Sequence, residues 1–171
     1  MEWDSLEFLL FTLDKYLFIG YFILLIVAVR VESKVSSVLI TFTVVAVVNG
    51  VMTSLVPLLY KVATNDGIAF KFLWYGTFGL LDVVAIYLLY KFHNLLRQNV
   101  SIVAEFAGGA FLLLATLQAI FFVEQYLFLS EYTRPIYQYG IPLVNVLLMP
   151  ILIVLWVIHT NPFKGRLHRA A

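Results

Sequence analysis

The chain has 171 residues, of which 63% are hydrophobic and 12% are charged, and its formal net charge at pH 7 is +1. Soluble proteins average about half apolar and about a quarter charged residues, so this composition excludes an ordinary soluble domain. Cysteine is absent, which excludes disulfide frameworks, thiolate metal sites and redox-active thiols. Because the chain has no basic domain, nucleic acid is not an expected partner.

Long apolar stretches fill most of the chain, with short polar connections between them. There are five, at about residues 6–29, 35–60, 68–91, 99–123 and 136–159. Each is near or above the roughly 20 residues that a helix needs to cross about 30 Å of hydrocarbon. The sequence therefore predicts an all-α, multi-pass integral membrane protein, a single bundle of about five transmembrane helices over residues 1–171. The plasma (inner) membrane is the expected location, and residues 160–171 form a short basic tail.

The first apolar stretch is interrupted by Asp14 and Lys15, a candidate buried ion pair. Either one tilted helix begins near Leu6 and holds this pair below the membrane surface, or residues 3–13 lie in the interface and the pair sits at its rim. The polar residues of 2–15 do not gather on one face, as an interfacial helix requires, so the continuous helix is favoured. The acidic N-terminus is unlike a signal peptide, so this helix is expected to be retained.

Two acids stand within predicted membrane helices, Asp82 in the third and Glu105 in the fourth. Asp82 lies nine residues from Lys91 and Glu105 seven residues from Gln98, so at 1.5 Å per residue the two depths differ by about 3 Å. The carboxyls could therefore meet and share a proton, since repulsion and desolvation oppose two neighbouring charges. This predicts a proton or cation site, and hydrogen bonding that merely holds the helices together is the alternative.

Two asparagines could complete that polar site. Asn49 lies in the middle of the second stretch, with Thr53 one helical turn further on. Asn145 follows Pro142 by three residues in the fifth stretch, where it could satisfy backbone groups freed by a kink. For both asparagines a structural role is the alternative to a site role.

The fourth stretch carries small residues at spacings of four and seven, which form a predicted helix-packing face: Ala104, Gly108, Ala115 and Ala119. Small side chains let a neighbouring helix backbone approach closely. This face either packs within the bundle or receives a second copy or a partner's helix. Aromatic residues near the predicted helix ends are expected to be interfacial anchors: Tyr60, Trp74, Tyr90, Tyr126, Tyr132, Tyr137, Tyr139 and Trp156.

The basic residues of the connections predict the orientation, because Lys and Arg favour the cytoplasmic side. One side would hold Arg30, Lys34, Lys91, Arg97, Lys164, Arg166 and Arg169, and the other Lys15, Lys61, Lys71 and Arg134. Seven against four predicts an N-outside, C-inside topology. The basic clusters are also expected to bind anionic lipid headgroups.

Enzyme motifs such as HExxH, GxSxG, CxxC and the P-loop are absent from the sequence. The three histidines lie at predicted helix ends or in the tail, away from the mid-membrane positions of paired haem ligands. No catalytic residue, metal site or cofactor is therefore predicted. The sequence favours a non-enzymatic interaction, assembly, sensory or regulatory subunit that binds other membrane subunits or its own copies. A small proton- or cation-coupled transporter, channel-like protein or transport subunit that uses Asp82 and Glu105 is the alternative.

Overall fold

The computed structural model describes residues 5–32, 34–63, 67–130 and 132–160, with side chains from Tyr16 onward. Over these residues the chain forms five α-helices and no strand. The helices are α1 (Ser5–Val31), α2 (Ser37–Ala63), α3 (Ile68–Leu95), α4 (Ile102–Leu127) and α5 (Arg134–His159). The prediction of an all-α helical bundle is confirmed.

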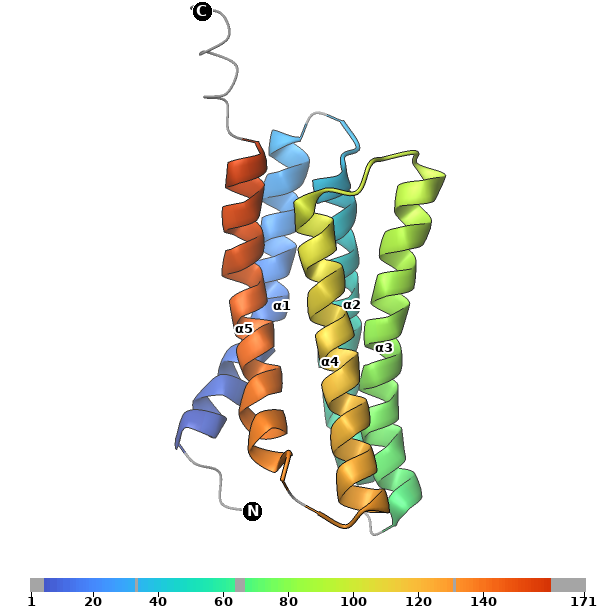
Figure 1. The fold of residues 1–171 in the computed structure, drawn as a ribbon. Helices are drawn as coiled ribbons and strands as arrows, with labels where there is room; N and C mark the ends of the chain where they lie inside the picture. The colour runs from blue at the N-terminus through green and yellow to red at the C-terminus, as the bar shows by residue number, and fades with distance from the viewer. Residues whose placement is uncertain (1–4, 33, 64–66, 131, 161–171) are drawn as a thin grey trace, which may run out of the picture.

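Four of these helices, α2 to α5, are long and apolar enough to cross a membrane. The described apolar part of α1 is shorter, from Tyr16 to Val31. Its backbone is nevertheless helical without interruption from Ser5 to Val31, as the continuous-helix prediction requires. The first turns of α1 lean away from the rest of the bundle (Figure 1). The side chains of Asp14 and Lys15 lie outside the described residues, so their pairing stays a prediction.

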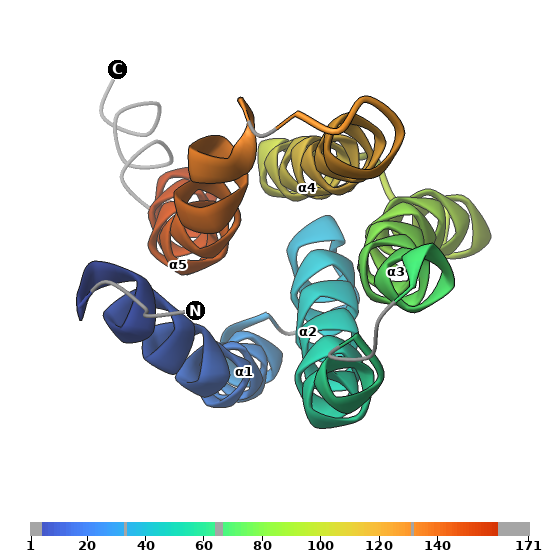
Figure 2. The ribbon, with the colours of Figure 1, turned by 90° about the horizontal axis from the view of Figure 1, so that it is seen from below.

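Short connections join the helices into an antiparallel series, which closes when α5 packs against α1 (Figures 1 and 2). Because the connections are only a few residues long, each helix packs antiparallel to the helix that precedes it in the chain. Because the number of helices is odd, α1 and α5 run in the same direction. Helix α2 also contacts α4, so it lies inward of a simple ring.

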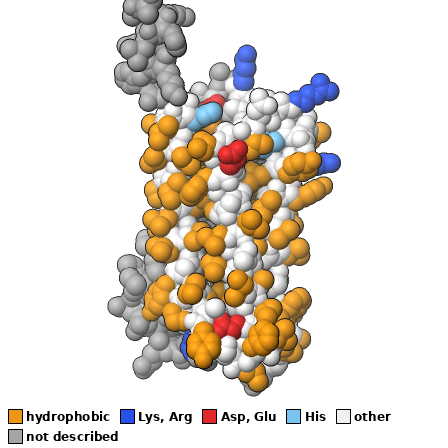
Figure 3. Space-filling model, viewed as in Figure 1, with side chains coloured by type: hydrophobic (Ala, Val, Ile, Leu, Met, Phe, Trp, Pro, Cys, Tyr) orange, Lys and Arg blue, Asp and Glu red, His pale blue; other side chains and the backbone are white. Residues whose placement is uncertain are grey.

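The outer surface of the bundle is apolar, with large hydrophobic side chains exposed on all five helices. In Figure 3 such side chains cover the face shown, and Lys and Arg side chains lie near its ends. A soluble protein rarely exposes apolar patches of this extent. The surface is therefore suited to contact with lipid, or with other apolar helices, around the bundle.

Trp156 is predicted to be an interfacial anchor from its position near a helix end, and the structure places its ring inside the bundle. It is 7% exposed, and its ring meets Phe42 of α2 edge-on, with the ring centroids 5.4 Å apart. Its Nε1 donates a hydrogen bond to Oε1 of Glu32, at 3.0 Å. Trp156 therefore joins α5 to α2 and to the connection after α1. Tyr137 likewise stacks on Phe121 of α4.

The connection between α4 and α5 is organised by Glu124. Its carboxylate accepts hydrogen bonds from the hydroxyl of Ser130 and from the main-chain N–H groups of Tyr132 and Thr133, at 2.7 to 2.9 Å. It also accepts one from the hydroxyl of Thr133, the N-cap residue of α5. A carboxylate beside a helix N-terminus is favoured by the helix dipole and by the unpaired N–H groups there.

We expect Glu124→Ala to lower the melting temperature of the detergent-solubilised protein, because it removes the acceptor of all four hydrogen bonds. Limited proteolysis should also cut the α4–α5 connection faster. The matched control is Glu105→Ala, which removes an exposed acid from the other end of the same helix. Equal effects of the two substitutions would contradict this role of Glu124.

Candidate functional site

Asp82 lies on the inner face of α3. The buried residues of this helix recur every three or four positions and form one stripe: Phe78, Asp82, Ala85, Leu89 and His93. Asp82 is 2% exposed, and its Oδ1 has no hydrogen-bond partner among the described residues. A charged side chain at the centre of a bilayer costs at least about 2.5 to 3.5 kcal/mol, which makes this carboxyl the most costly polar group among the described helix interiors.

The structure does not bring Asp82 and Glu105 together. A Cβ added at Gly79 would lie 3.6 Å from Cβ of Gln118, and one added at Gly108 would lie 3.9 Å from Cδ1 of Leu89. This register of α3 against α4 places Asp82 at the level of Ala115, ten residues and about 15 Å along the axis from Glu105. Glu105 is also exposed.

The expectation of a shared depth is wrong because the helix ends lie elsewhere than predicted. Helix α3 continues to Leu95, whereas α4 begins only at Ile102 after the N-cap Ser101, whose side chain accepts a hydrogen bond from the N–H of Ala104. Glu105 therefore falls in the first turn of α4, where the helix dipole favours a negative charge. Asp82 is buried in the interior of the bundle, without Glu105 beside it.

The two asparagines make hydrogen bonds of their own. Nδ2 of Asn49 donates to the carbonyl oxygen of Val45 in the preceding turn of α2, at 3.0 Å. The main-chain carbonyl of Asn145 accepts from the hydroxyl of Tyr21 at 3.3 Å, which links α5 to α1. Among the described residues, no hydrogen bond joins either asparagine to Asp82. The contacts therefore do not support the prediction that the two asparagines form a site with Asp82.

The predicted packing face of α4 is directed toward α3. Ala104 is buried, and Gly108 faces Leu89. Ala115 and Ala119 line a hollow of about 390 Å³ between the two helices, and Gly76 and Gly79 line it from α3. The hollow is rimmed by side chains exposed on the outer surface of the bundle, Leu80, Val83 and Val123.

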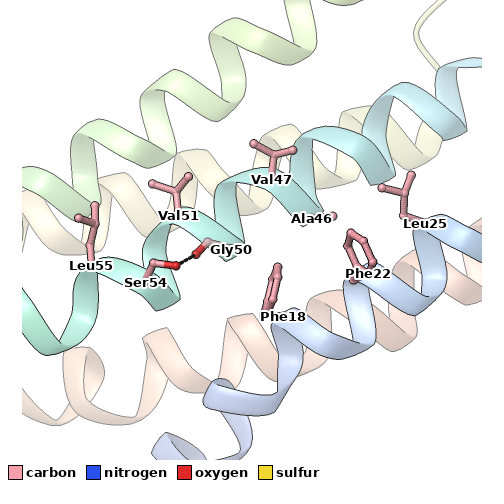
Figure 4. A pocket seen from close by; sticks show the side chains of 9 residues that line it. All are labelled: Phe18, Phe22, Leu25, Ala46, Val47, Gly50, Val51, Ser54 and Leu55. Atoms are coloured by element: carbon pink, nitrogen blue, oxygen red, sulfur yellow. Dashed lines mark hydrogen bonds between the residues drawn. The ribbon is translucent and has the colours of Figure 1, made fainter.

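A second hollow, of about 420 Å³, lies between α1 and α2. Phe18 and Phe22 of α1 point toward α2, where Gly50 lies beside the ring of Phe18 (Figure 4). The hydroxyl of Ser54 donates to the carbonyl oxygen of Gly50 within α2, so it offers no proton to a ligand. Both hollows are therefore apolar, which suits lipid chains or helices better than polar substrates.

A buried polar cluster joins α2, α3 and α4 at one end of the bundle. Oγ of Ser37 lies 2.7 Å from Nε2 of His93 and 2.9 Å from Oγ of Ser101. The N–H of Ser101 donates to Oγ of Ser37, also at 2.9 Å. Nδ1 of His93 lies 2.7 Å from the carbonyl oxygen of Leu89, so it carries a proton and donates to that oxygen.

The cluster of Ser37, His93 and Ser101 resembles a nucleophile with its base, but its surroundings favour a structural role. The three side chains are 8%, 3% and 7% exposed, and none of them lines either hollow. Sequence reasoning placed His93 at the interface and did not find this cluster. Two serines at helix starts and a histidine at a helix end, all on the same side of the bundle, were the available signal.

The described part of the chain defines a class: an all-α bundle in which four helices are long and apolar enough to cross a membrane, with a buried acid in its interior and apolar hollows on its surface. Comparison with family models, curated proteins and solved structures finds no match for this chain.

Proposed function

We propose that this protein is a non-enzymatic membrane subunit that works by binding a transmembrane helix, from another membrane protein or from a second copy of the chain. The observation that carries the proposal is the hollow between α3 and α4. Two glycines of α3 and two alanines of α4 are among its lining residues, and small residues of this kind let the backbone of an incoming helix approach closely. The exposed apolar rim would then be covered.

Interhelical contact of this kind requires good shape complementarity, because lipid is as apolar as the helices themselves. The double substitution Ala115→Phe and Ala119→Phe fills the hollow. We therefore expect it to raise the dissociation constant of the complex at least tenfold. Native mass spectrometry of the protein extracted in mild detergent gives the stoichiometry and identifies the partner.

The matched control is Val47→Phe, which adds a similar ring beside the other hollow, between α1 and α2. It should leave the complex intact. A purely monomeric wild-type protein would contradict the proposal, as would a complex that resists filling of the α3–α4 hollow. Loss of the complex in the control as well would mean that the α3–α4 hollow is not the specific seat.

The second candidate is proton- or cation-coupled transport, favoured by one observation, the unpartnered interior carboxyl of Asp82. Because Asp82 and Glu105 are separated, a proton or cation path that uses both acids has no support. A flux of protons or cations into proteoliposomes that Asp82→Asn abolishes, while the variant remains folded, would establish transport. An unchanged flux would exclude Asp82 from it.

We further propose the N-outside, C-inside orientation, in a plasma membrane. It is supported by four exposed basic residues at the end of the bundle where α1 and α3 finish: Arg30, Lys34, Lys91 and Arg97. These residues would contact anionic lipid headgroups. Accessibility of single cysteines introduced at Lys34 and Lys61 to a membrane-impermeant reagent in intact cells tests the orientation, since only the outer site should react.

A further inference from the structure

The interior of the bundle offers Asp82 no counter-ion. Helix α3 packs against α2 and α4, and residues 35–60, 72–81, 83–90 and 106–123 contain no Asp, Glu, Lys, Arg or His. Residues 16–29 of α1 and 135–158 of α5 contain none either. Asp82 is thus the one residue of these types in the central stretches of the five helices.

The nearest charged groups lie far away along the axes. On α3 itself, Lys71 and Lys91 are eleven and nine residues from Asp82, or about 16 and 14 Å. Nζ of Lys71 also donates to the carbonyl oxygen of Ala63. On α4, Glu105 and Glu124 are ten and nine residues from the level of Asp82, and on α2 the first cation is Lys61 at its far end. Tyr75, two turns away on α3, is uncharged at neutral pH.

We infer that Asp82 is a proton-binding site, a carboxyl that is neutral in the folded protein at physiological pH. A buried carboxylate without a hydrogen-bond donor or a cation is strongly disfavoured, whereas a neutral carboxyl avoids the much larger cost of burying a charge. With an unpartnered Oδ1 and 2% exposure, Asp82 has neither a donor at that oxygen, among the described residues, nor solvent to stabilise a negative charge. This inference does not depend on the helix-binding function.

A proton bound only in the folded state couples folding to pH. Above about pH 5 the carboxyl of an unfolded chain is ionised, so folding must take up one proton at Asp82. The stability of the folded protein therefore falls as the pH rises. The unfolding equilibrium constant should increase by up to tenfold per pH unit while the folded carboxyl stays neutral.

Infrared difference spectroscopy near pH 7, of the wild type against Asp82→Asn in mild detergent, tests the inference. We expect the band of a neutral carboxylic acid in the wild type and its loss in the variant. Glu105→Gln is the matched control and should keep the band. The inference would be overturned if Asp82→Asn removed a carboxylate band from the spectrum and left the neutral-acid band unchanged.

The pH dependence of unfolding gives the second readout. The melting temperature of the wild type should fall as the pH is raised, and Asp82→Asn should remove this slope, while Glu105→Gln keeps it. If Asp82→Asn does not fold, Asp82→Ala takes its place in both measurements. An equal slope in the wild type and in a folded Asp82 variant would overturn the inference, whatever complexes the protein forms.

Discussion

Asp82→Ala is expected to stabilise the folded protein, by about 1 to 3 kcal/mol at neutral pH. A buried polar group without a partner costs about this much, and alanine removes the group. The neighbours one turn away, Gly79 and Ala85, are small, and the register of α3 against α4 places another small residue, Ala115, at the same level as Asp82. Little packing is therefore lost with the carboxyl, and reversible unfolding in mild detergent measures the gain.

The contrast with Glu124 makes this prediction specific. Both substitutions replace a helix acid by alanine, but Glu124 accepts four hydrogen bonds and Asp82 has an oxygen without a partner. Opposite signs are expected, destabilisation for Glu124 and stabilisation for Asp82. A loss of stability in Asp82→Ala would show that the carboxyl makes a favourable interaction in the membrane protein, and the role of Asp82 as an isolated site would be wrong.

Ser37→Ala is expected to destabilise the bundle by about 2 to 4 kcal/mol. Oγ of Ser37 contacts Nε2 of His93 and both the N–H and the hydroxyl of Ser101. Its removal leaves Nε2 of His93 and the N–H of Ser101 without this partner, whereas the hydroxyl oxygen of Ser101 still accepts from the N–H of Ala104. Each unpaired buried group costs about 1 to 3 kcal/mol. The loss is measured by the same unfolding experiment.

Ser54→Ala is the control for Ser37→Ala. The hydroxyl of Ser54 is exposed and bonds only to the carbonyl of Gly50 in its own helix, so the change should stay within about 0.5 kcal/mol. A double-mutant cycle of Ser37→Ala with His93→Phe should give a coupling energy of about 0.5 to 3 kcal/mol, the range for residues in one hydrogen-bond network. Additive effects of the two substitutions would argue against a shared cluster.

Sequence reasoning singles out Asp82 but does not predict its surroundings. It found Asp82 because a charge inside an apolar helix stands out in any sequence. It assigned Glu105 as its partner on the basis of depths counted from Lys91 and Gln98. Those residues lie short of the actual end of α3 at Leu95 and before the actual start of α4 at Ile102. An error of a few residues at each helix end became a separation of about 15 Å.

The position of an aromatic residue near a helix end likewise does not predict its contacts. A tryptophan near the end of an apolar helix is typical of an interfacial anchor, yet Trp156 packs against Phe42 and bonds to Glu32. A ring at a helix end faces either lipid or a neighbouring helix, and the sequence of one helix does not contain the rotation that decides between them. That rotation is set by packing against other helices.

The amino-acid sequence by itself determined the helices and their number, because an apolar helix satisfies its backbone hydrogen bonds within its own segment. It also determined the antiparallel series, since the connections are too short for any other path. Only the tertiary structure decided the register and rotation of the helices, which depend on side chains far apart in the chain. That structure separated Asp82 from Glu105, joined Ser37, His93 and Ser101, and formed the hollow between α3 and α4.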